Sequence, residues 1–229
     1  QRCNGTAKAE FLPLDLGDVT SVRACAAQFL SRGLPLHLLI NNAGLAGAKA
    51  MTASGFEQTF GVCHVGHFLL TQLLLDTLKA SAPARVVVVA SKIHYRAKGI
   101  NFDVLQQQTT SVGQLKEYGV AKLANVLFAK ELARRVAGTG ITTYALHPGV
   151  VATDVWRAVP RPFDALIKKF MMSEEQGAAT TLHCATSAEA GAQSGLYYDK
   201  CKPQTPSAVS QDEALAAKLW AASEAWVVG

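Results

Sequence analysis

Tyr118 and Lys122 are the pair of residues with the clearest chemical potential in this sequence. They lie at i and i+4 where a helical pattern begins, and the inner stripe continues through Val126, Ala129 and Ala133, so both polar groups should emerge on one face. An ammonium near a phenol lowers a pKa that begins at about 10, which makes a tyrosine a usable acid or base near neutrality. The spacing alone is a weak signal, because a solvated lysine beside a core tyrosine also produces it.

Short apolar runs alternate with longer segments of helical periodicity along the chain. Continuous apolar strands between helices are typical of a parallel sheet covered on both faces, which predicts an α/β, doubly wound, Rossmann-type fold. The 229 residues contain no linker, so we expect a single domain, 1–229. The predicted strands are 10–14, 36–40, 85–90, 141–146 and 195–198, and the predicted helices are one from about 20, one from about 54, 114–137, 173–186 and 211–225.

In such a sheet, ligands bind beyond the carboxyl ends of the strands, so the residues directly after each strand are informative. Small and polar residues at four of these ends predict a nucleotide site. They are Asp15 after the first strand, Asn41-Asn42-Ala43-Gly44 after the second, Ser91 after the third and His147-Pro148-Gly149 after the fourth.

Composition argues against several other classes of function. No run of 18 or more apolar residues is present, so we expect no segment of these residues to span a bilayer. The net charge is +5, but the basic residues are scattered among acids, which argues against a nucleic-acid partner. This charge is compatible with a phosphorylated cofactor or with peripheral contact with an anionic membrane.

The cysteines do not indicate a disulfide framework or a zinc site, because they are odd in number, widely spaced and without a C-x-x-C pair. We therefore expect an intracellular, reducing location: the cytoplasm, or the endoplasmic reticulum membrane if an anchor precedes Gln1. His64 and His67, beside Cys63, could suggest a metal site, but no third ligand is placed and we predict none. The five cysteines are Cys3, Cys25, Cys63, Cys184 and Cys201.

Four motifs occur in a fixed order: N-N-A-G after one strand, Ser91 closing the valine-rich strand, Y-x-x-x-K opening the next helix, and P-G-V-V-A-T after the strand beyond. With these motifs, the chain from Glu10 to about Trp226 resembles the short-chain dehydrogenase/reductase family. It is most similar to the retinol-dehydrogenase branch, on the phrases L-H-L-L-I-N-N-A-G, V-G-H-F-L-L-T, S-A-P-A-R-V-V-V-V-A-S, A-K-L-A-N-V-L-F and Y-A-L-H-P-G-V-V.

The resemblance implies a role for each residue of the site. Tyr118 would be the acid/base, Lys122 its electrostatic partner and a binder of the nicotinamide ribose, and Ser91 the hydroxyl that orients the substrate oxygen. The implied cofactor is NADP, with NAD as the alternative, and hydride would pass directly between carbon centres. The other implied cofactor contacts are Asp15 at the adenine, Asn42, Ala43 and Gly44 along the adenosine, and Pro148, Gly149, Val151 and Thr153 at the nicotinamide amide.

Five of these residues also have a structural interpretation without a ligand. Asp15 could be a turn residue before a helix, and Gly44 and Gly149 could serve turns only. Thr153 could cap the next segment, and Ser91 could be an ordinary serine at a strand end.

Two departures from the family pattern bear on activity. No Gly-rich turn precedes Glu10, so we expect these residues to lack the N-terminal β-α-β unit that grips the cofactor pyrophosphate, and to bind cofactor poorly. Cys63 stands where the resemblance implies a catalytic asparagine that holds a relay water, and a thiol is a weak hydrogen-bond partner.

Residues 154–172 mix apolar and basic side chains where the family places a lid over its substrate, which suits a lipophilic ligand or simple loop packing. The leading hypothesis is thus an oxidoreductase of lipophilic alcohols or carbonyls such as retinoids, and a homodimer stays open. The rival is a truncated or impaired family member acting as a non-enzymatic interaction protein. A sugar epimerase is a weaker third interpretation, since it would also use Tyr and Lys.

Overall fold

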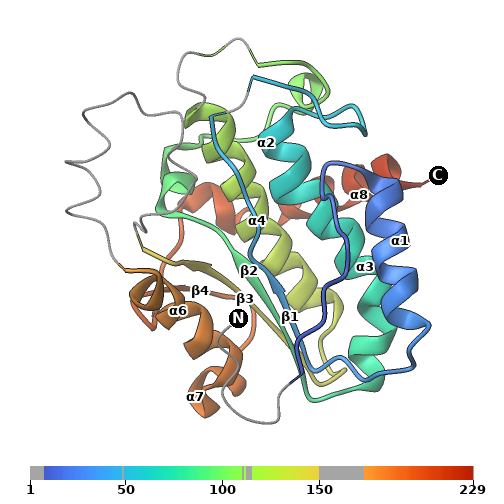
Figure 1. The fold of residues 1–229 in the computed structure, drawn as a ribbon. Helices are drawn as coiled ribbons and strands as arrows, with labels where there is room; N and C mark the ends of the chain where they lie inside the picture. Colours follow the sequence, from blue (N-terminus) through green and yellow to red (C-terminus); the bar gives the residue numbers. More distant parts are fainter. Residues whose placement is uncertain (1–7, 48, 110, 112–114, 150–172, 229) are drawn as a thin grey trace.

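The computed structural model describes residues 8–47, 49–109, 111, 115–149 and 173–228. Its centre is a five-stranded sheet in the order β1-β2-β3-β4-β5, parallel except for the last pair. Helices lie on both faces, so the predicted doubly wound α/β fold is confirmed (Figure 1). The strands are β1 (Leu38–Asn41), β2 (Ala84–Val89), β3 (Ile141–His147), β4 (Leu196–Asp199) and β5 (Lys202–Gln204).

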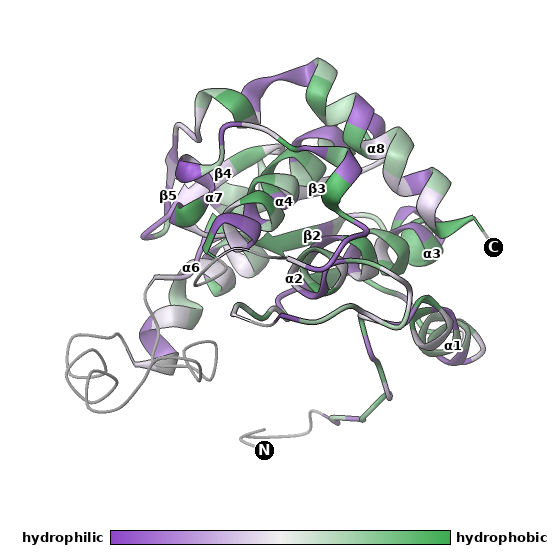
Figure 2. Ribbon diagram, turned by 90° about the horizontal axis from the view of Figure 1, so that it is seen from above, coloured by the Kyte–Doolittle hydropathy of each residue, from purple (hydrophilic) through white to green (hydrophobic). Residues whose placement is uncertain are grey.

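The two faces of β2 enter different cores, because successive side chains of a strand point to opposite sides. Val86 and Val88 pack into a core that they share with three helices, whereas Val87 and Val89 pack into a second core that they share with two different helices. The strands appear green, that is hydrophobic, where they pass between these layers (Figure 2). The helices are α3 (Gly66–Ala80), α4 (Leu115–Arg135) and α8 (Glu213–Val227) on the first face, and α6 (Glu174–Thr186) and α7 (Ala188–Gly191) on the second.

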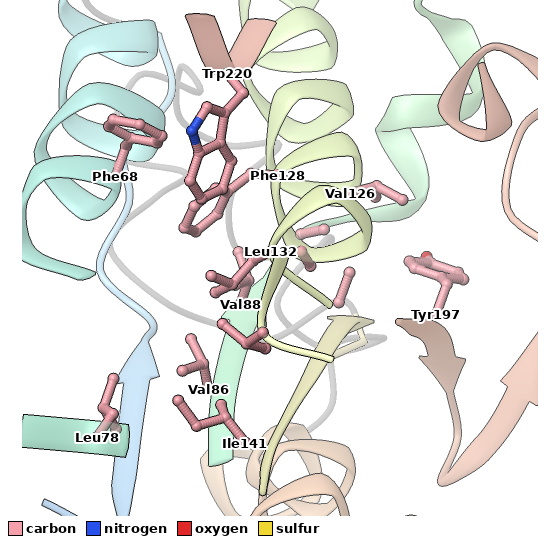
Figure 3. Close-up of a cluster of buried hydrophobic side chains, with 14 of the residues drawn as sticks. Phe68, Leu78, Val86, Val88, Val126, Phe128, Leu132, Ile141, Tyr197 and Trp220 are labelled. Carbon is pink, nitrogen blue, oxygen red and sulfur yellow. The ribbon is translucent and has the colours of Figure 1, made fainter. Parts of the chain in front are cut away.

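Three aromatic rings hold α3, α4 and α8 together above the sheet (Figure 3). The ring of Phe68 lies 5.1 Å from that of Trp220, and Phe128 stacks on the same indole at 5.9 Å. Removing one such ring would cost about 3–5 kcal/mol of stability, because the surrounding side chains cannot fill the space. This cluster fixes α4, and with it the residues that α4 carries.

The predicted strand at 10–14 is wrong. Residues 8–15 have no regular secondary structure, no strand pairs with them in the part of the chain that the structure describes, and Phe11 is 84% exposed. An extended segment becomes a strand only when a neighbour supplies hydrogen bonds. Figure 2 shows this segment leading away from the sheet.

The helix predicted from about Ser54 begins later, at α2 (Gln58–Phe60), where the Glu57 carboxylate accepts the N–H groups of Thr59 and Phe60. Ser54 instead accepts the N–H of Val19 at the start of α1 (Val19–Leu30). Between α2 and α3 the chain makes one π-helical turn, Gly61–Val65. Such turns insert one extra residue into a helix and often occur at functional sites.

A close approach ties the segment before α1 to α3. A Cβ placed on Gly66 would lie only 2.3 Å from the carbonyl oxygen of Leu16, so glycine is required there. Val22 and Ala26 of α1 then pack against α3 beside Leu70. None of the helices that the structure describes is long and apolar enough to cross a membrane.

Candidate active site

Lys122 is the central charged group of the site. It lies on α4, is 3% exposed, and donates a hydrogen bond from Nζ to the carbonyl oxygen of Val89 at 2.8 Å. Asn125, three residues further along α4, donates to the same oxygen at 3.2 Å. Burial lowers the pKa of the Lys122 ammonium, because removal from water disfavours the charged form. Two side chains of α4 are thus anchored to the end of β2.

Tyr118 lies one turn before Lys122, whose Nζ is 5.6 Å from the centre of the phenol ring. Burial raises the pKa of the Tyr118 phenol to about 12, and nearby Cys63 adds to the increase. Our expectation of a lowered pKa is therefore wrong for this structure. The physical reason is that the ammonium points at the Val89 carbonyl while the phenol is desolvated.

Ser91 follows β2 and caps the 3-10 turn η2 (Lys92–Arg96), where its Oγ accepts the N–H of Ile93 at 3.3 Å. Its hydroxyl also acts on Tyr118: a hydrogen bond from Ser91 lowers the pKa of the phenol and opposes the effect of burial. A hydrogen bond lowers an acid's pKa by stabilising the anion, so the Ser91 hydroxyl opposes the desolvation of the phenol. The structure brings Ser91, Tyr118 and Lys122 together, and their roles in a reaction stay a prediction.

Gly44 and Cys63 complete the surroundings of the ammonium. A Cβ on Gly44 would lie 3.3 Å from both the Sγ of Cys63 and the Nζ of Lys122, so glycine keeps this space clear. Cys63 comes from the π-helical turn, is fully buried, and donates its S–H to the carbonyl of Leu45 at 3.6 Å. The thiol therefore lies beside the lysine, at the position where the resemblance implies an asparagine.

The remaining predicted cofactor residues are less closely connected to this cluster. Asn42 and Ala43 are exposed at the end of β1, and Pro148 and Gly149 are half-buried after β3, with Gly149 at φ 99°. Val151, Thr153 and the predicted lid 154–172 lie outside the described residues.

Asp15 occupies a turn before α1. Its Oδ1 accepts the N–H of Gly17 at 2.8 Å, and its own N–H donates to Ser21 at 2.9 Å. The carboxylate is exposed, and both of these bonds are local. The structure therefore gives Asp15 the turn role that the sequence left open, and a contact with adenine stays a prediction.

His64 and His67 are buried and bonded within the protein. The Nε2 of His64 lies 2.8 Å from the hydroxyl of Ser223, and the Nδ1 of His67 lies 3.1 Å from the carbonyl of Cys63. Burial lowers the pKa of His64 to about 3 and that of His67 to about 4. Within the described ranges, no group of three or more His, Cys, Asp or Glu side chains could hold a metal ion.

Sequence reasoning missed one polar residue next to the site, Asn125, and gave no individual role to another, His147. Asn125 shares the Val89 carbonyl with Lys122, and its i+3 spacing from that lysine is a signal that could have found it. His147 ends β3, and its Nδ1 accepts the N–H of Lys92 at 3.4 Å. Burial lowers the pKa of His147 to about 4, although the charge of Asp199 opposes this.

A cavity of about 820 Å³ lies on another side of α4. Phe60, Leu105 and Val120 give it apolar walls, and Ser91, Tyr118 and Lys122 are not among its lining residues. The cavity is therefore separate from the cluster that could carry chemistry.

Comparisons with known proteins agree with the fold and the motifs. The family model described as short chain dehydrogenase matches residues 1–162. The chain is 44% identical to retinol dehydrogenase 12 of Mus musculus over 218 residues, 90% of this chain and 66% of that protein. It is 42% identical to the WW domain-containing oxidoreductase of Danio rerio over 229 residues, 95% of this chain and 55% of that protein.

The chain therefore spans between 55% and 66% of the length of these two relatives. Among solved structures, that of an uncharacterized protein from Mycobacterium Paratuberculosis superimposes with a TM-score of 0.71 at 32% identity, covering 93% of this chain and 74% of that one. With the family model matching most of its length, this chain belongs to the short-chain dehydrogenase/reductase family and to its retinol-dehydrogenase-like branch.

Proposed function

We propose that the protein is an oxidoreductase that transfers hydride between NADP and a lipophilic alcohol or carbonyl compound such as a retinoid. The observation that carries this proposal is the cluster at the end of β2, where a serine hydroxyl, a phenol and a buried ammonium converge. Family membership supports the reaction class, and the relatives named retinol dehydrogenase support the substrate class.

The residues present fit the nicotinamide half of the cofactor. Among the described residues, Lys122 Nζ has one hydrogen-bond acceptor, the Val89 carbonyl, so further N–H groups remain for ribose hydroxyls. Gly44 leaves room beside the ammonium for a ligand. When bound, the nicotinamide supplies or accepts the hydride. The other residues that we propose to contact the cofactor are Asp15, Asn42, Ala43, Pro148, Gly149, Val151 and Thr153.

The protonation state of Tyr118 favours carbonyl reduction. With its pKa raised to about 12, the phenol keeps its proton at neutral pH and can donate it from Oη to a carbonyl oxygen. The Ser91 hydroxyl, which also affects the pKa of this phenol, would orient that oxygen. Alcohol oxidation needs the phenolate, which this environment disfavours until another positive charge lies nearby.

A second candidate, a non-enzymatic interaction protein, is favoured by one observation. Cys63 lies beside Lys122, where its thiol cannot hold a relay water as an amide would. A protein that had left catalysis could keep the fold, the ammonium and the phenol for structural reasons alone.

Steady-state kinetics separates these candidates. The chain would be given all-trans-retinal or butanal, with NADPH raised until the rate is constant and cofactor binding followed by calorimetry. We expect reduction of both aldehydes, with kcat/KM at least about tenfold higher for retinal, because its apolar surface is removed from water. A chain that binds NADPH yet reduces neither aldehyde would overturn the enzyme proposal and support the interaction protein.

A further inference from the structure

The turn η2, which carries Ser91 at its start, is linked to the C-terminal part of the chain by successive side chains. Lys92 forms an ion pair with Asp199 at the end of β4, with Nζ 2.8 Å from Oδ2. The hydroxyl of Tyr95 donates to the carbonyl of Thr205 at 2.6 Å. The turn that follows Ser91 is thus joined to residues about a hundred positions later in the sequence.

His94 makes the third link, and it is the buried one. Its side chain is 0% exposed, with Nδ1 2.7 Å from the carbonyl oxygen of Ser91 and Nε2 3.2 Å from the backbone nitrogen of Ser207. A backbone N–H can only donate, so Nε2 must accept and the proton must lie on Nδ1. His94 therefore bridges the two segments as a neutral imidazole that uses both ring nitrogens.

Neighbouring rings hold this imidazole in place. Its centre lies 4.1 Å from the ring of Tyr95 and 4.9 Å from the ring of Tyr197. The hydroxyls of Tyr197 and Ser207 are buried and have no partner among the described residues. The imidazole is therefore the buried group of this cluster that joins the two segments by hydrogen bonds, beside the exposed link from Tyr95 to Thr205.

The orientation of Ser91 depends on its backbone, and its backbone carbonyl is where His94 acts. That oxygen accepts both the backbone N–H of His94, at 3.1 Å, and its imidazole N–H. The hydroxyl of Ser91 accepts from the N–H of Ile93, so it is fixed by the same turn. A shift of about 1 Å in a group that orients a substrate can cost about a hundredfold in rate.

We propose that His94 is a positioning residue: by joining the Ser91 carbonyl to the Ser207 N–H, it makes the C-terminal segment hold η2, and with it Ser91, against the start of α4, where a Cβ on Gly119 would lie 3.4 Å from the carbonyl oxygen of Ile93. His94 touches neither substrate nor cofactor in this arrangement and acts through Ser91. The proposal rests on the proposed function, because the placement of Ser91 affects a rate only where Ser91 orients a substrate oxygen.

Two variants separate hydrogen bonding from ring packing. His94→Phe keeps a planar ring between the tyrosines and removes both bonds, whereas His94→Gln keeps one donor and one acceptor. His37→Phe is the matched control, since His37 also bonds a backbone carbonyl, that of Ser81 at 2.7 Å, but lies before β1 and is exposed. We expect kcat with retinal to fall about tenfold or more in His94→Phe, to recover at least in part in His94→Gln, and to stay unchanged in His37→Phe.

Two further measurements distinguish positioning from a general loss of structure. The NADPH dissociation constant should stay within about twofold in all three variants, because none alters the proposed cofactor contacts. Amide hydrogen exchange at Ser207 should accelerate in His94→Phe, because its N–H loses its acceptor, and should stay slow in His37→Phe. An unchanged kcat in His94→Phe would overturn the proposal.

If the parent chain itself shows no turnover, the proposed function fails while the link can still be measured. The positioning role then fails with the proposed function, whereas faster exchange at Ser207 in His94→Phe would still show that His94 links the two segments, and unaltered exchange would overturn that link as well.

Discussion

β1 and β2 are neighbours in the sheet, but their surroundings differ. β2 has a strand on each side, and Val86, Val87 and Val88 are fully buried. β1 has only β2 beside it among the described residues; Ile40 is 38% exposed, and the buried Asn41 keeps an Oδ1 without a partner. Within the described ranges, β2 is thus enclosed on all sides, whereas β1 presents an open edge.

The residues proposed for the reaction lie beside β2, whereas Asn42 and Asp15, proposed for the cofactor, lie on the side of β1. Ser91 follows β2, and Tyr118 and Lys122 lie on the helix packed against it. Asn42 follows β1 and Asp15 precedes α1, and both are exposed. A proton-transfer group needs fixed, desolvated surroundings, and these exist at β2. The comparison teaches that these residues can support the chemistry more firmly than they can hold the adenosine half of a cofactor.

The largest expected effect concerns the buried residues beside β2 that we propose for the reaction. Tyr118→Phe should lower kcat by about 10²–10⁴-fold, because it removes the transferable proton while the ring keeps its packing. Cofactor affinity should barely change, whereas Lys122→Ala should weaken both affinity and rate. Steady-state kinetics with NADPH titrations would measure these effects. A Tyr118→Phe variant that keeps most of its kcat would show that another group is the acid.

The second prediction tests the exposed residues near β1 that we propose to contact the cofactor. An upstream β-α-β unit with a Gly-rich turn, taken from a family member and joined before Gln1, should strengthen NADPH binding at least about a hundredfold, or about 2.7 kcal/mol. The control is the same unit with its glycines replaced by alanine. Calorimetry that finds micromolar binding by the 229 residues alone would show that these exposed residues already suffice.

The third prediction concerns the pH dependence of stability, which three buried histidines should determine. Burial keeps the pKa values of His64, His67 and His147 at about 3, 4 and 4. The unfolded chain binds protons below about pH 6.5 while these folded histidines stay neutral, so stability falls as pH falls. Each should contribute a loss of about 2 kcal/mol between pH 6.5 and 5. Urea unfolding at pH 7 and pH 5 measures it, and equal midpoints would contradict the prediction.

The smallest expected effect concerns Cys63, which lies beside Lys122 where the family pattern has an asparagine. Cys63→Asn should raise kcat about tenfold, or about 1.4 kcal/mol in the barrier, because an amide can hold a relay water beside Lys122. Cys63→Ala is the control and should give no gain. Rates compared at equal NADPH saturation decide the matter. A rate that stays near zero in Cys63→Asn would favour the interaction protein.

Much of the fold follows from local pattern. β2 and β3 were predictable because an apolar, β-branched run buried on both faces makes a strand in almost any such sheet. The segment 10–14 has a similar pattern, but its state depends on a neighbour that its own residues do not supply. β5 (Lys202–Gln204) was missed because it is fully exposed and contains Pro203, so no alternation marks it.

For the site, spacing predicted which side chains converge but not how they act on one another. That Tyr118 and Lys122 share a helix face follows from the i, i+4 rule. That the ammonium turns toward the carbonyl of Val89, and so leaves the phenol pKa high, depends on where a strand ends in space. The link from His94 to Ser207 spans more than a hundred residues, and no local pattern contains it.

The π-helical turn Gly61–Val65 has a consequence for how this segment can vary in evolution. Cys63 faces the lysine from this turn, while His64, the next residue, bonds Ser223 on α8. Deleting one residue would restore a regular helix and rotate the preceding residues by about 100° relative to α3. Cys63 would then lose its place beside Lys122, and His64 would lose its bond with Ser223. Evolution can therefore change the side chain at position 63 far more easily than the number of residues in the turn, and inserted or deleted codons here should be rarer than substitutions.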